Sequence, residues 1–277
     1  MATGSKIKES KQSPELPKQL PIDFLKKITN NFAEDRIISE GPFGTLYKGI
    51  VPDDDKVIAV KKLQDNAPMS ADKTFSKEFD KRYIQADITE SLICYEYLPN
   101  GSLQANLFDT KASAKQEINW DTRFKIIKGI CQGLFFLHKL DIPIVHMDLK
   151  PENILLGVDM VPKIADFALS RVFGQEQTRL CTQTVVGSYG YMAPEYLYRG
   201  EQNPREQPSA RNFVDKVRKD WTLQHITSHS KYASLDSGSL QEVKTCIEIG
   251  IRCVEIDRRN RPPIEEIVGT LEGLRPS

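Results

Sequence analysis

Hydrophobic and polar positions in the first third of the chain follow patterns that predict a small β-rich unit. Residues 22–32 place apolar side chains at helical spacing, whereas residues 36–63 alternate and carry β-branched residues around a turn at 52–55. The expected elements are a helix over 22–32, a hairpin over 36–63 with a half-buried strand at 57–63, a short helix over 70–80 and a strand over 91–98. The turn Pro99-Asn100-Gly101 follows the last of these.

The rest of the chain is mainly helical in pattern. Residues 119–140 form a long amphipathic helix, for which Asn119 or Asp121 is the N-cap. The other expected elements are short strands around 154–156 and 163–164 and helices over 209–226, 239–256 and 263–274. We predict an α+β, bilobal fold in which a disordered segment, 1–21, precedes a β-rich lobe, 22–98, and a larger α-helical lobe, 99–277, with a cleft between the lobes.

Composition and charge exclude several classes of function. Lys+Arg and Asp+Glu both number 38, so the net charge is zero and nothing favours a general nucleic-acid or membrane-surface binder. No apolar run approaches the roughly 20 residues of a membrane helix, and residues 1–21 lack the apolar core of a signal peptide. The five cysteines show no metal-ligand spacing, which favours a reduced, cytoplasmic location.

A glycine turn and a strand lysine are the first candidates for chemistry. Gly41 and Gly44 bracket a turn whose backbone N–H groups could approach a phosphate closely. Lys61 lies on the strand 57–63, and Glu78, on the helix over 70–80, could reach back to pair with it. Alone, such a lysine is usually a solvated edge residue and such a turn is usually only a hairpin turn.

The stretch IVHMDLKPENILL, residues 144–156, holds the second group of candidates. Asp148 would accept or orient a hydroxyl proton, and Lys150 would neutralise charge on a transferring phosphoryl group. Asn153 and Asp166 are both oxygen ligands of the kind that Mg²⁺ requires. Any one of these could be a turn residue or a helix cap. Their joint occurrence, in this order after the glycine turn and the strand lysine, favours phosphoryl transfer.

These residues together resemble the motifs of a eukaryotic protein kinase over residues 36–275. The quoted motifs are Gly41-x-x-Gly44, Val60-Lys61, Glu78, His146-x-Asp148-x-Lys150-x-x-Asn153, Asp166-Phe167-Ala168 and Ala193-Pro194-Glu195. The form Asp-Leu-Lys-Pro-Glu-Asn is similar to serine/threonine kinases. Plant receptor-like kinases of the Pelle-related group are similar to this chain in three sequence segments, YEYLPNGSL, WDTRFKIIKGICQGLFFLH and GSYGYMAPEYL.

The resemblance implies ATP and Mg²⁺ as cofactors, and a protein substrate or signalling partner. Glu96 to Leu98 would form the hinge that hydrogen-bonds adenine, behind which Tyr95 would guard the pocket. Ala59 and Leu155 would be further nucleotide-binding residues. Glu195 would pair with Arg261. The location implied is cytoplasmic, as a free chain or as the intracellular part of a membrane receptor kinase.

Several positions depart from the pattern. Met147 replaces the arginine that pairs with phosphate on the activation segment, which is typical of the non-RD subset. Ala168 replaces a glycine, and only 16 residues, 79–94, separate Glu78 from Tyr95, a span in which residues 81–86 could supply the extra strand. These features predict a β-rich lobe that is shortened after its regulatory helix.

A second apparent gap follows Glu195. Residues 196–211 contain two prolines and no long apolar run where kinases have a central hydrophobic helix. The apolar faces of 122–137 and 240–256 are therefore expected to be partly exposed or covered by another protein. Three interpretations stay open on the sequence: an active serine/threonine kinase, a pseudokinase that binds nucleotide or a partner, and a degenerate chain that folds poorly.

Overall fold

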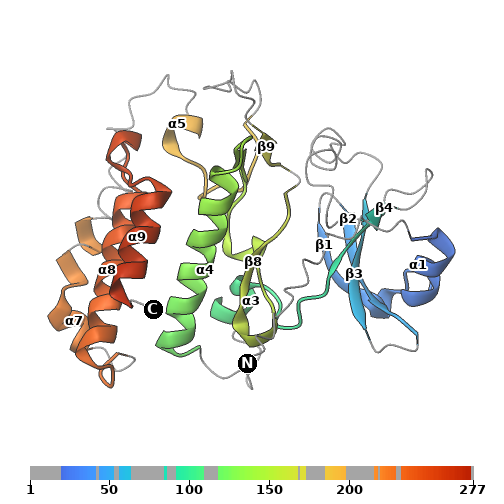
Figure 1. Ribbon diagram of the computed structural model, residues 1–277, viewed down its shortest axis with the longest axis horizontal. Helices are drawn as coiled ribbons and strands as arrows, with labels where there is room; N and C mark the ends of the chain where they lie inside the picture. Colours follow the sequence, from blue (N-terminus) through green and yellow to red (C-terminus); the bar gives the residue numbers. More distant parts are fainter. Residues whose placement is uncertain are drawn as a thin grey trace, which may run out of the picture. The chain divides into compact units, whose positions relative to one another are not determined.

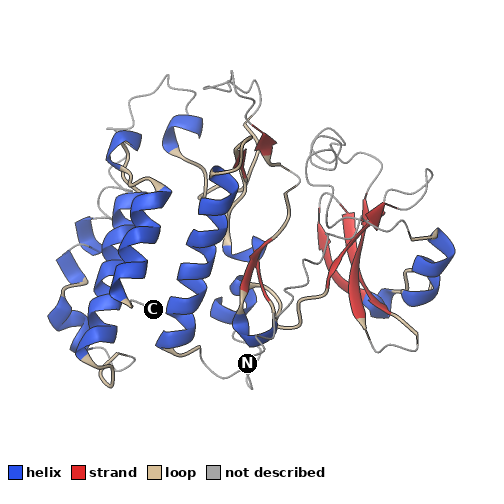
Figure 2. Ribbon diagram, in the orientation of Figure 1, coloured by secondary structure: helices blue, strands red, loops and turns tan. Residues whose placement is uncertain are grey.

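The computed structural model divides into two units, residues 1–97 and 98–277 (Figures 1 and 2). The described residues are 20–41, 44–52, 56–63, 84–85, 92–108, 118–167, 169–172, 185–197, 215–217, 219–228 and 232–275. The expected disordered segment lies outside them except for Leu20, which packs against the core of the first unit, and Pro21. The helix predicted over 70–80 also lies outside the described residues.

The first unit contains a five-stranded sheet in the order β1-β2-β3-β5-β4. Its strands are β1 (Ile37–Gly41), β2 (Gly44–Ile50), β3 (Val57–Leu63), β4 (Ile84–Gln85) and β5 (Leu92–Glu96), and the 3₁₀ turn η1 (Glu34–Arg36) precedes them. The predicted hairpin is confirmed, because β2 and β3 pair antiparallel from Gly44 opposite Leu63 to Ile50 opposite Val57. The short β4 pairs with β5 and falls inside the strand predicted within 81–86.

Helix α1 (Ile22–Ile28) packs against one face of this sheet. Leu25 and Ile28 of the helix meet Val60 of β3 in a core cluster, and these side chains are at most 2% exposed. Successive strand residues point to opposite faces, so Ala59 and Lys61 lie on the face away from α1. The helix is shorter than predicted, since residues 30–32 adopt positive φ angles after it ends.

The second unit holds most of the helices. Its elements in chain order are α3 (Leu103–Phe108), α4 (Trp120–His138), β6 (Ile144–Val145), η2 (Pro151–Asn153), β7 (Ile154–Leu156), η3 (Val158–Met160), β8 (Pro162–Ile164), β9 (Arg171–Val172), α5 (Pro194–Leu197), α7 (Leu223–Ser228), α8 (Ser237–Cys253), η5 (Arg258–Asn260) and α9 (Ile264–Leu274). Asn119 is the N-cap of α4, with its side chain accepting from the Thr122 amide at 2.9 Å. The two strands predicted around 154–156 and 163–164 pair as β7 and β8.

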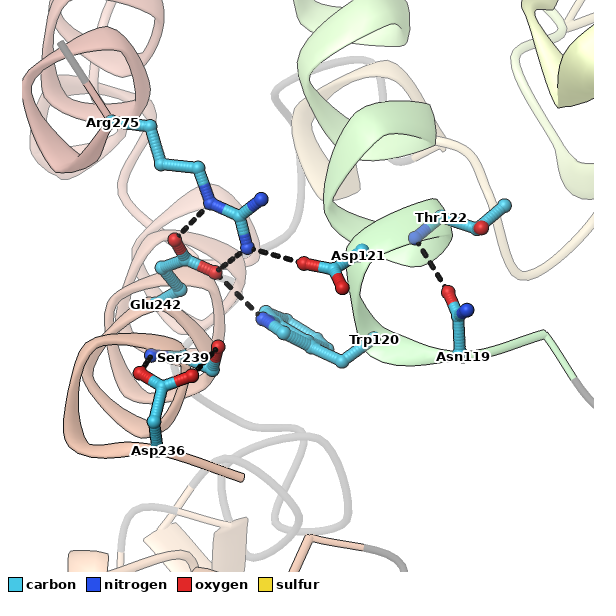
Figure 3. A network of polar contacts seen from close by, with 8 residues as sticks. All are labelled: Asn119, Trp120, Asp121, Thr122, Asp236, Ser239, Glu242 and Arg275. Atoms are coloured by element: carbon cyan, nitrogen blue, oxygen red, sulfur yellow. Dashed lines mark hydrogen bonds and ion pairs between the residues drawn. The ribbon is translucent and has the colours of Figure 1, made fainter. Parts of the chain in front are cut away.

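Helices α4, α8 and α9 share a hydrophobic core centred on Phe124, Ile267 and Leu271. A polar network closes one end of this core, where Arg275 contacts Glu242 of α8 and Asp121 of α4 (Figure 3). The Trp120 indole also donates to Glu242, at 2.8 Å. One buried carboxylate thus joins α4 to α8 and to the end of α9, although α4 is far from them in sequence.

The helices predicted over 239–256 and 263–274 correspond to α8 and α9. The prediction over 209–226 is wrong as a continuous helix, because residues 221–222, just before α7, are not helical. Residues 198–214, where the central helix is predicted to be missing, lie outside the described residues. The apolar faces of 122–137 and 240–256, which are expected to be partly exposed, differ along their length. Helices α8 and α9 cover Phe124, whereas Phe136 and Val254 are 60% and 57% exposed.

Candidate active site

The carboxylate of Asp148 is the centre of the polar site in the second unit. It follows β6 in the chain and is 9% exposed. The Ser188 amide donates to Oδ1 at 2.8 Å, and Asn153 Nδ2 lies 3.1 Å from Oδ2. Lys150 Nζ is 3.4 Å from the same Oδ2 atom. Hydrogen bonds and one cation therefore hold the carboxylate in a single orientation.

This environment keeps Asp148 ionised. Burial by itself raises the pKa of the Asp148 carboxyl, but hydrogen bonds from Ser188 and the charge of Lys150 outweigh that effect. The resulting pKa lies below its ordinary value. An ionised carboxylate of this kind can accept or orient a hydroxyl proton.

Lys150 is oriented by a second contact. Its Nζ donates to the Ser188 hydroxyl oxygen at 2.6 Å. Ser188 therefore contacts Asp148 through its backbone amide and Lys150 through its side chain. Ser188, which is forty residues from Asp148 in the chain, is not among the candidate residues predicted from the sequence. Its place in GSYGYMAPEYL, just before the Ala-Pro-Glu motif, is the signal that could have found it.

His146 connects the Asp148 segment to the segment that holds Asp166. Its Nε2 donates to the Ala165 carbonyl at 2.8 Å, and its Nδ1 accepts from the Asp148 amide at 3.3 Å. One nitrogen donates and the other accepts, so the ring is neutral. Burial lowers the pKa of His146, in agreement with that state. Its ring also meets Phe167 edge-on, with 4.8 Å between centroids.

Met147 lies between His146 and Asp148 in the chain and adopts a φ of 68°. Its carbonyl faces Gly187, where an added Cβ would lie 3.1 Å from the oxygen. The backbone of Gly187 has a φ of 136°, a conformation that side-chain-bearing residues rarely adopt. The glycine therefore allows the segment carrying Ser188 to approach the Asp148 segment closely.

The two predicted metal ligands lie at the same end of the β7–β8 hairpin. Asn153 comes directly before β7 and Asp166 follows β8 after one residue, and the Ala165 amide donates to the Asn153 carbonyl at 2.8 Å. The Asn153 amide nitrogen faces Asp148, with bonds of 2.8 and 3.1 Å, so its amide oxygen is the atom directed elsewhere. An amide oxygen and a carboxylate fit a hard cation such as Mg²⁺.

Glu195 and Arg261 form the ion pair that the motif implies. Two parallel bonds of 2.8 Å join their side chains, and Arg261 also donates to the backbone carbonyls of Glu255 and Ile256. Burial raises the pKa of Glu195, but hydrogen bonds from Arg261 outweigh this and hold it below its ordinary value. The pair fixes α5 relative to the segment between α8 and α9.

The first unit places its predicted residues on neighbouring strands. Gly41 and Gly44 face each other across the β1–β2 turn, and Ala59, 5% exposed, lies opposite Tyr95. Gly44 has a φ of 142°, and a Cβ there would lie 2.2 Å from the Lys62 carbonyl oxygen. Glycine is therefore required at that point.

The remaining predicted residues are described in part. Glu96 is exposed at the end of β5, and Leu98 begins the second unit, where its side chain approaches Gly157. Leu155 lies in β7 and bridges to Ser102. Glu78 and Ala168 lie outside the described residues, as do Thr178, Thr182 and Thr184, the threonines of the activation segment that could carry phosphate. Within the part described, none of the helices is long and apolar enough for a membrane span.

Comparison with known proteins relates this geometry to one family. The model of the protein kinase domain matches residues 32–211. Cysteine-rich receptor-like protein kinase 6 of Oryza sativa subsp. japonica is 33% identical over 283 residues, covering 90% of this chain and 40% of that protein. Receptor-like serine/threonine-protein kinase SD1-7 of Arabidopsis thaliana is 34% identical over 293 residues, covering 92% and 34%.

The chain therefore spans well under half the length of these curated relatives. The resemblance drawn from the motifs is confirmed, including the β-sheet unit and the helical unit that a kinase domain contains. A family model that covers most of the chain, together with these relatives, identifies it as a member of the protein kinase domain family, homologous to plant receptor-like serine/threonine kinases.

Proposed function

We propose that the chain is an active serine/threonine kinase, which transfers the γ-phosphate of ATP to hydroxyl groups of a protein substrate. The observation that carries the proposal is the set of contacts around Asp148, which is ionised and held by Ser188, Asn153 and Lys150. These contacts orient an ionised carboxylate so that it can accept or direct a hydroxyl proton.

The residues have distinct roles in this mechanism. Asp148 accepts or orients the proton of the substrate hydroxyl, which is the group that attacks the γ-phosphorus. Lys150 lies 3.4 Å from the Asp148 carboxylate and neutralises charge on the phosphoryl group during transfer. Lys61 contacts the phosphates, and Glu78 is its proposed partner. Electrostatic positioning of this kind supplies most of the rate enhancement in phosphoryl transfer.

Asn153 and Asp166 are the proposed ligands of Mg²⁺. Their oxygen atoms suit the ion, and both residues lie at the same end of the β7–β8 hairpin. When bound, Mg²⁺ neutralises negative charge on the ATP phosphates. Gly41, Gly44, Ala59, Glu96, Leu98 and Leu155 are the other proposed nucleotide-binding residues.

The proposed partners and location follow from the same interpretation of the chain as a kinase. We propose a protein substrate or signalling partner, no nucleic-acid ligand, and a cytoplasmic location, either free or as part of a receptor kinase. We assign the chain to the non-RD type, because Met147 supplies no cation to the activation segment.

Phosphate transfer tests the proposal against the pseudokinase alternative. The purified chain is incubated with Mg²⁺, labelled ATP and casein, beside the Asp148→Asn variant. We expect labelling of casein by the native chain and a loss of at least about 10²-fold in the variant, since the variant lacks the proton acceptor. If both proteins bind Mg-ATP equally and neither labels casein above background, the chain is a nucleotide-binding module instead of an enzyme.

A further inference from the structure

We infer that Tyr196 is a positioning residue for phosphoryl transfer, because its hydroxyl fixes the segment that carries Ser188. The inference rests on the proposed function, since Ser188 matters through Asp148 and Lys150. Among the described interactions, Tyr196 makes no hydrogen bond to either of these side chains. It acts on the backbone two residues before Ser188.

The phenol of Tyr196 satisfies both backbone groups of a single residue. Its hydroxyl donates to the Val186 carbonyl at 3.1 Å and accepts from the Val186 amide at 3.0 Å. The side chain thus bonds to the two backbone groups to which a neighbouring strand would otherwise bond, and both hydrogen bonds depend on one oxygen atom. Replacing Tyr196 by phenylalanine would therefore free the two groups together and leave the ring in place.

Val186 is joined to Ser188 by a constrained glycine. Gly187 has a φ of 136°, and an added Cβ would lie 3.1 Å both from the Met147 carbonyl oxygen and from the Met192 side chain. The backbone at this point is thus packed directly on the residue that precedes Asp148. A shift of Val186 would be passed on to Ser188 within two residues.

At the other end, Tyr196 is rigidly held. It lies in α5 next to Glu195, whose carboxylate is bound by Arg261 through two bonds of 2.8 Å. The Tyr196 amide also donates to the Ala193 carbonyl at 3.0 Å. The sequence of contacts therefore runs from the Glu195–Arg261 ion pair, through the Tyr196 hydroxyl, to the backbone that supports Ser188.

Catalysis is sensitive to this path because Ser188 orients two side chains. Its amide donates to Asp148 at 2.8 Å, and its hydroxyl accepts from Lys150 at 2.6 Å. A displacement of about 1 Å in such a group can cost about 10²-fold in rate. Nucleotide binding should be spared, since none of the proposed nucleotide-binding residues contacts Val186 or Tyr196 among the described interactions.

The test is the Tyr196→Phe variant, with Tyr189→Phe as its matched control. Tyr189 lies in the same segment but is 85% exposed, and none of the described contacts involves its hydroxyl. We expect Tyr196→Phe to lower kcat for casein by about 10- to 100-fold. The KM for ATP should stay within about twofold, and the amides of residues 186–188 should exchange hydrogen faster. Tyr189→Phe should change neither amide exchange nor kcat.

A double-mutant cycle measures how much of the effect of Tyr196 passes through the Ser188 hydroxyl. Ser188→Ala removes the contact to Lys150 and keeps the amide contact to Asp148, so the double variant should lose kcat by somewhat less than the product of the two single effects. A Tyr196→Phe variant with native kcat would overturn the inference. An inactive native chain would instead overturn the proposed function. In that case the exchange rates of residues 186–188 still decide whether Tyr196 holds the segment.

Discussion

Arg261 binds Glu195 through two parallel hydrogen bonds, Nη1 to Oε1 and Nη2 to Oε2, each 2.8 Å long. Such bidentate pairs are the strongest of the common side-chain ion pairs. The pair is only partly buried, with the two side chains 20% and 36% exposed. Solvent screening therefore limits what it contributes, and we expect Glu195→Gln to lower the free energy of unfolding by only about 1 kcal/mol at pH 7.

This contribution should depend on pH with a definite sign. The pKa of Glu195 is lower in the folded state than its ordinary value of 4.5. The stabilisation is thus fully present above that value and is lost as the pH falls through the folded pKa. Urea denaturation of the native chain and of Glu195→Gln should show a difference at pH 7 that shrinks below pH 4.5. An equal difference at both pH values would mean that the ionised pair does not cause it.

Local sequence signals predicted local structure well. The N-cap at Asn119 and the strands at 154–156 and 163–164 could be predicted because capping and alternation act over a few residues. Contacts between segments far apart in the chain could largely not be predicted from the sequence. Apart from the family motif around Ser188, nothing local in the sequence indicates that Ser188 contacts Asp148, since the contact depends on how the intervening forty residues fold back. The Glu195–Arg261 pair was foreseen only through the family resemblance.

Mg-ATP binding should depend on Lys61 and Asp166. We expect Lys61→Met and Asp166→Asn each to weaken it by about tenfold or more, roughly 1.4 kcal/mol, measured by calorimetry. The matched control is Lys62→Met. Lys62 is the next residue of β3 and points to the opposite face, where its ammonium lies 4.9 Å from the centre of the Phe32 ring. If Lys62→Met weakens binding as much as Lys61→Met does, the assignment of Lys61 is wrong.

Met147 should uncouple activity from charge on the activation segment. It carries no cation to bind a phosphate, so Thr184→Glu should change kcat far less than Asp148→Asn does. Placing an arginine at the position, Met147→Arg, should make the same Thr184→Glu change activating. Phosphate transfer to casein by the native chain, the three single variants and the double variant Met147→Arg with Thr184→Glu measures both effects. A large activation by Thr184→Glu in the native background would show that another cation serves this role.

Glu242 and Arg275 should matter for stability and not for chemistry. Glu242 is 4% exposed, and its carboxylate accepts from Arg275 and, at 2.8 Å, from the Trp120 indole (Figure 3). Removing one partner of a fully buried ion pair costs about 3–5 kcal/mol, because the other charge stays buried. The Arg275 side chain is 42% exposed, so water can partly replace it. We therefore expect Arg275→Ala to cost about 1–3 kcal/mol.

The double variant Arg275→Ala with Glu242→Gln separates the loss of the ion-pair attraction from the cost of leaving the Glu242 charge buried. In Arg275→Ala the Glu242 carboxylate retains only the Trp120 indole among these partners, whereas Arg275→Ala with Glu242→Gln replaces that carboxylate by an uncharged amide. The second substitution should therefore restore part of the stability lost in the first, as measured by urea denaturation. The Asp121→Asn control should have little effect, since the Asp121 side chain is 73% exposed. If the double variant is less stable than Arg275→Ala, attraction to other donors around Glu242 outweighs the cost of burying its charge.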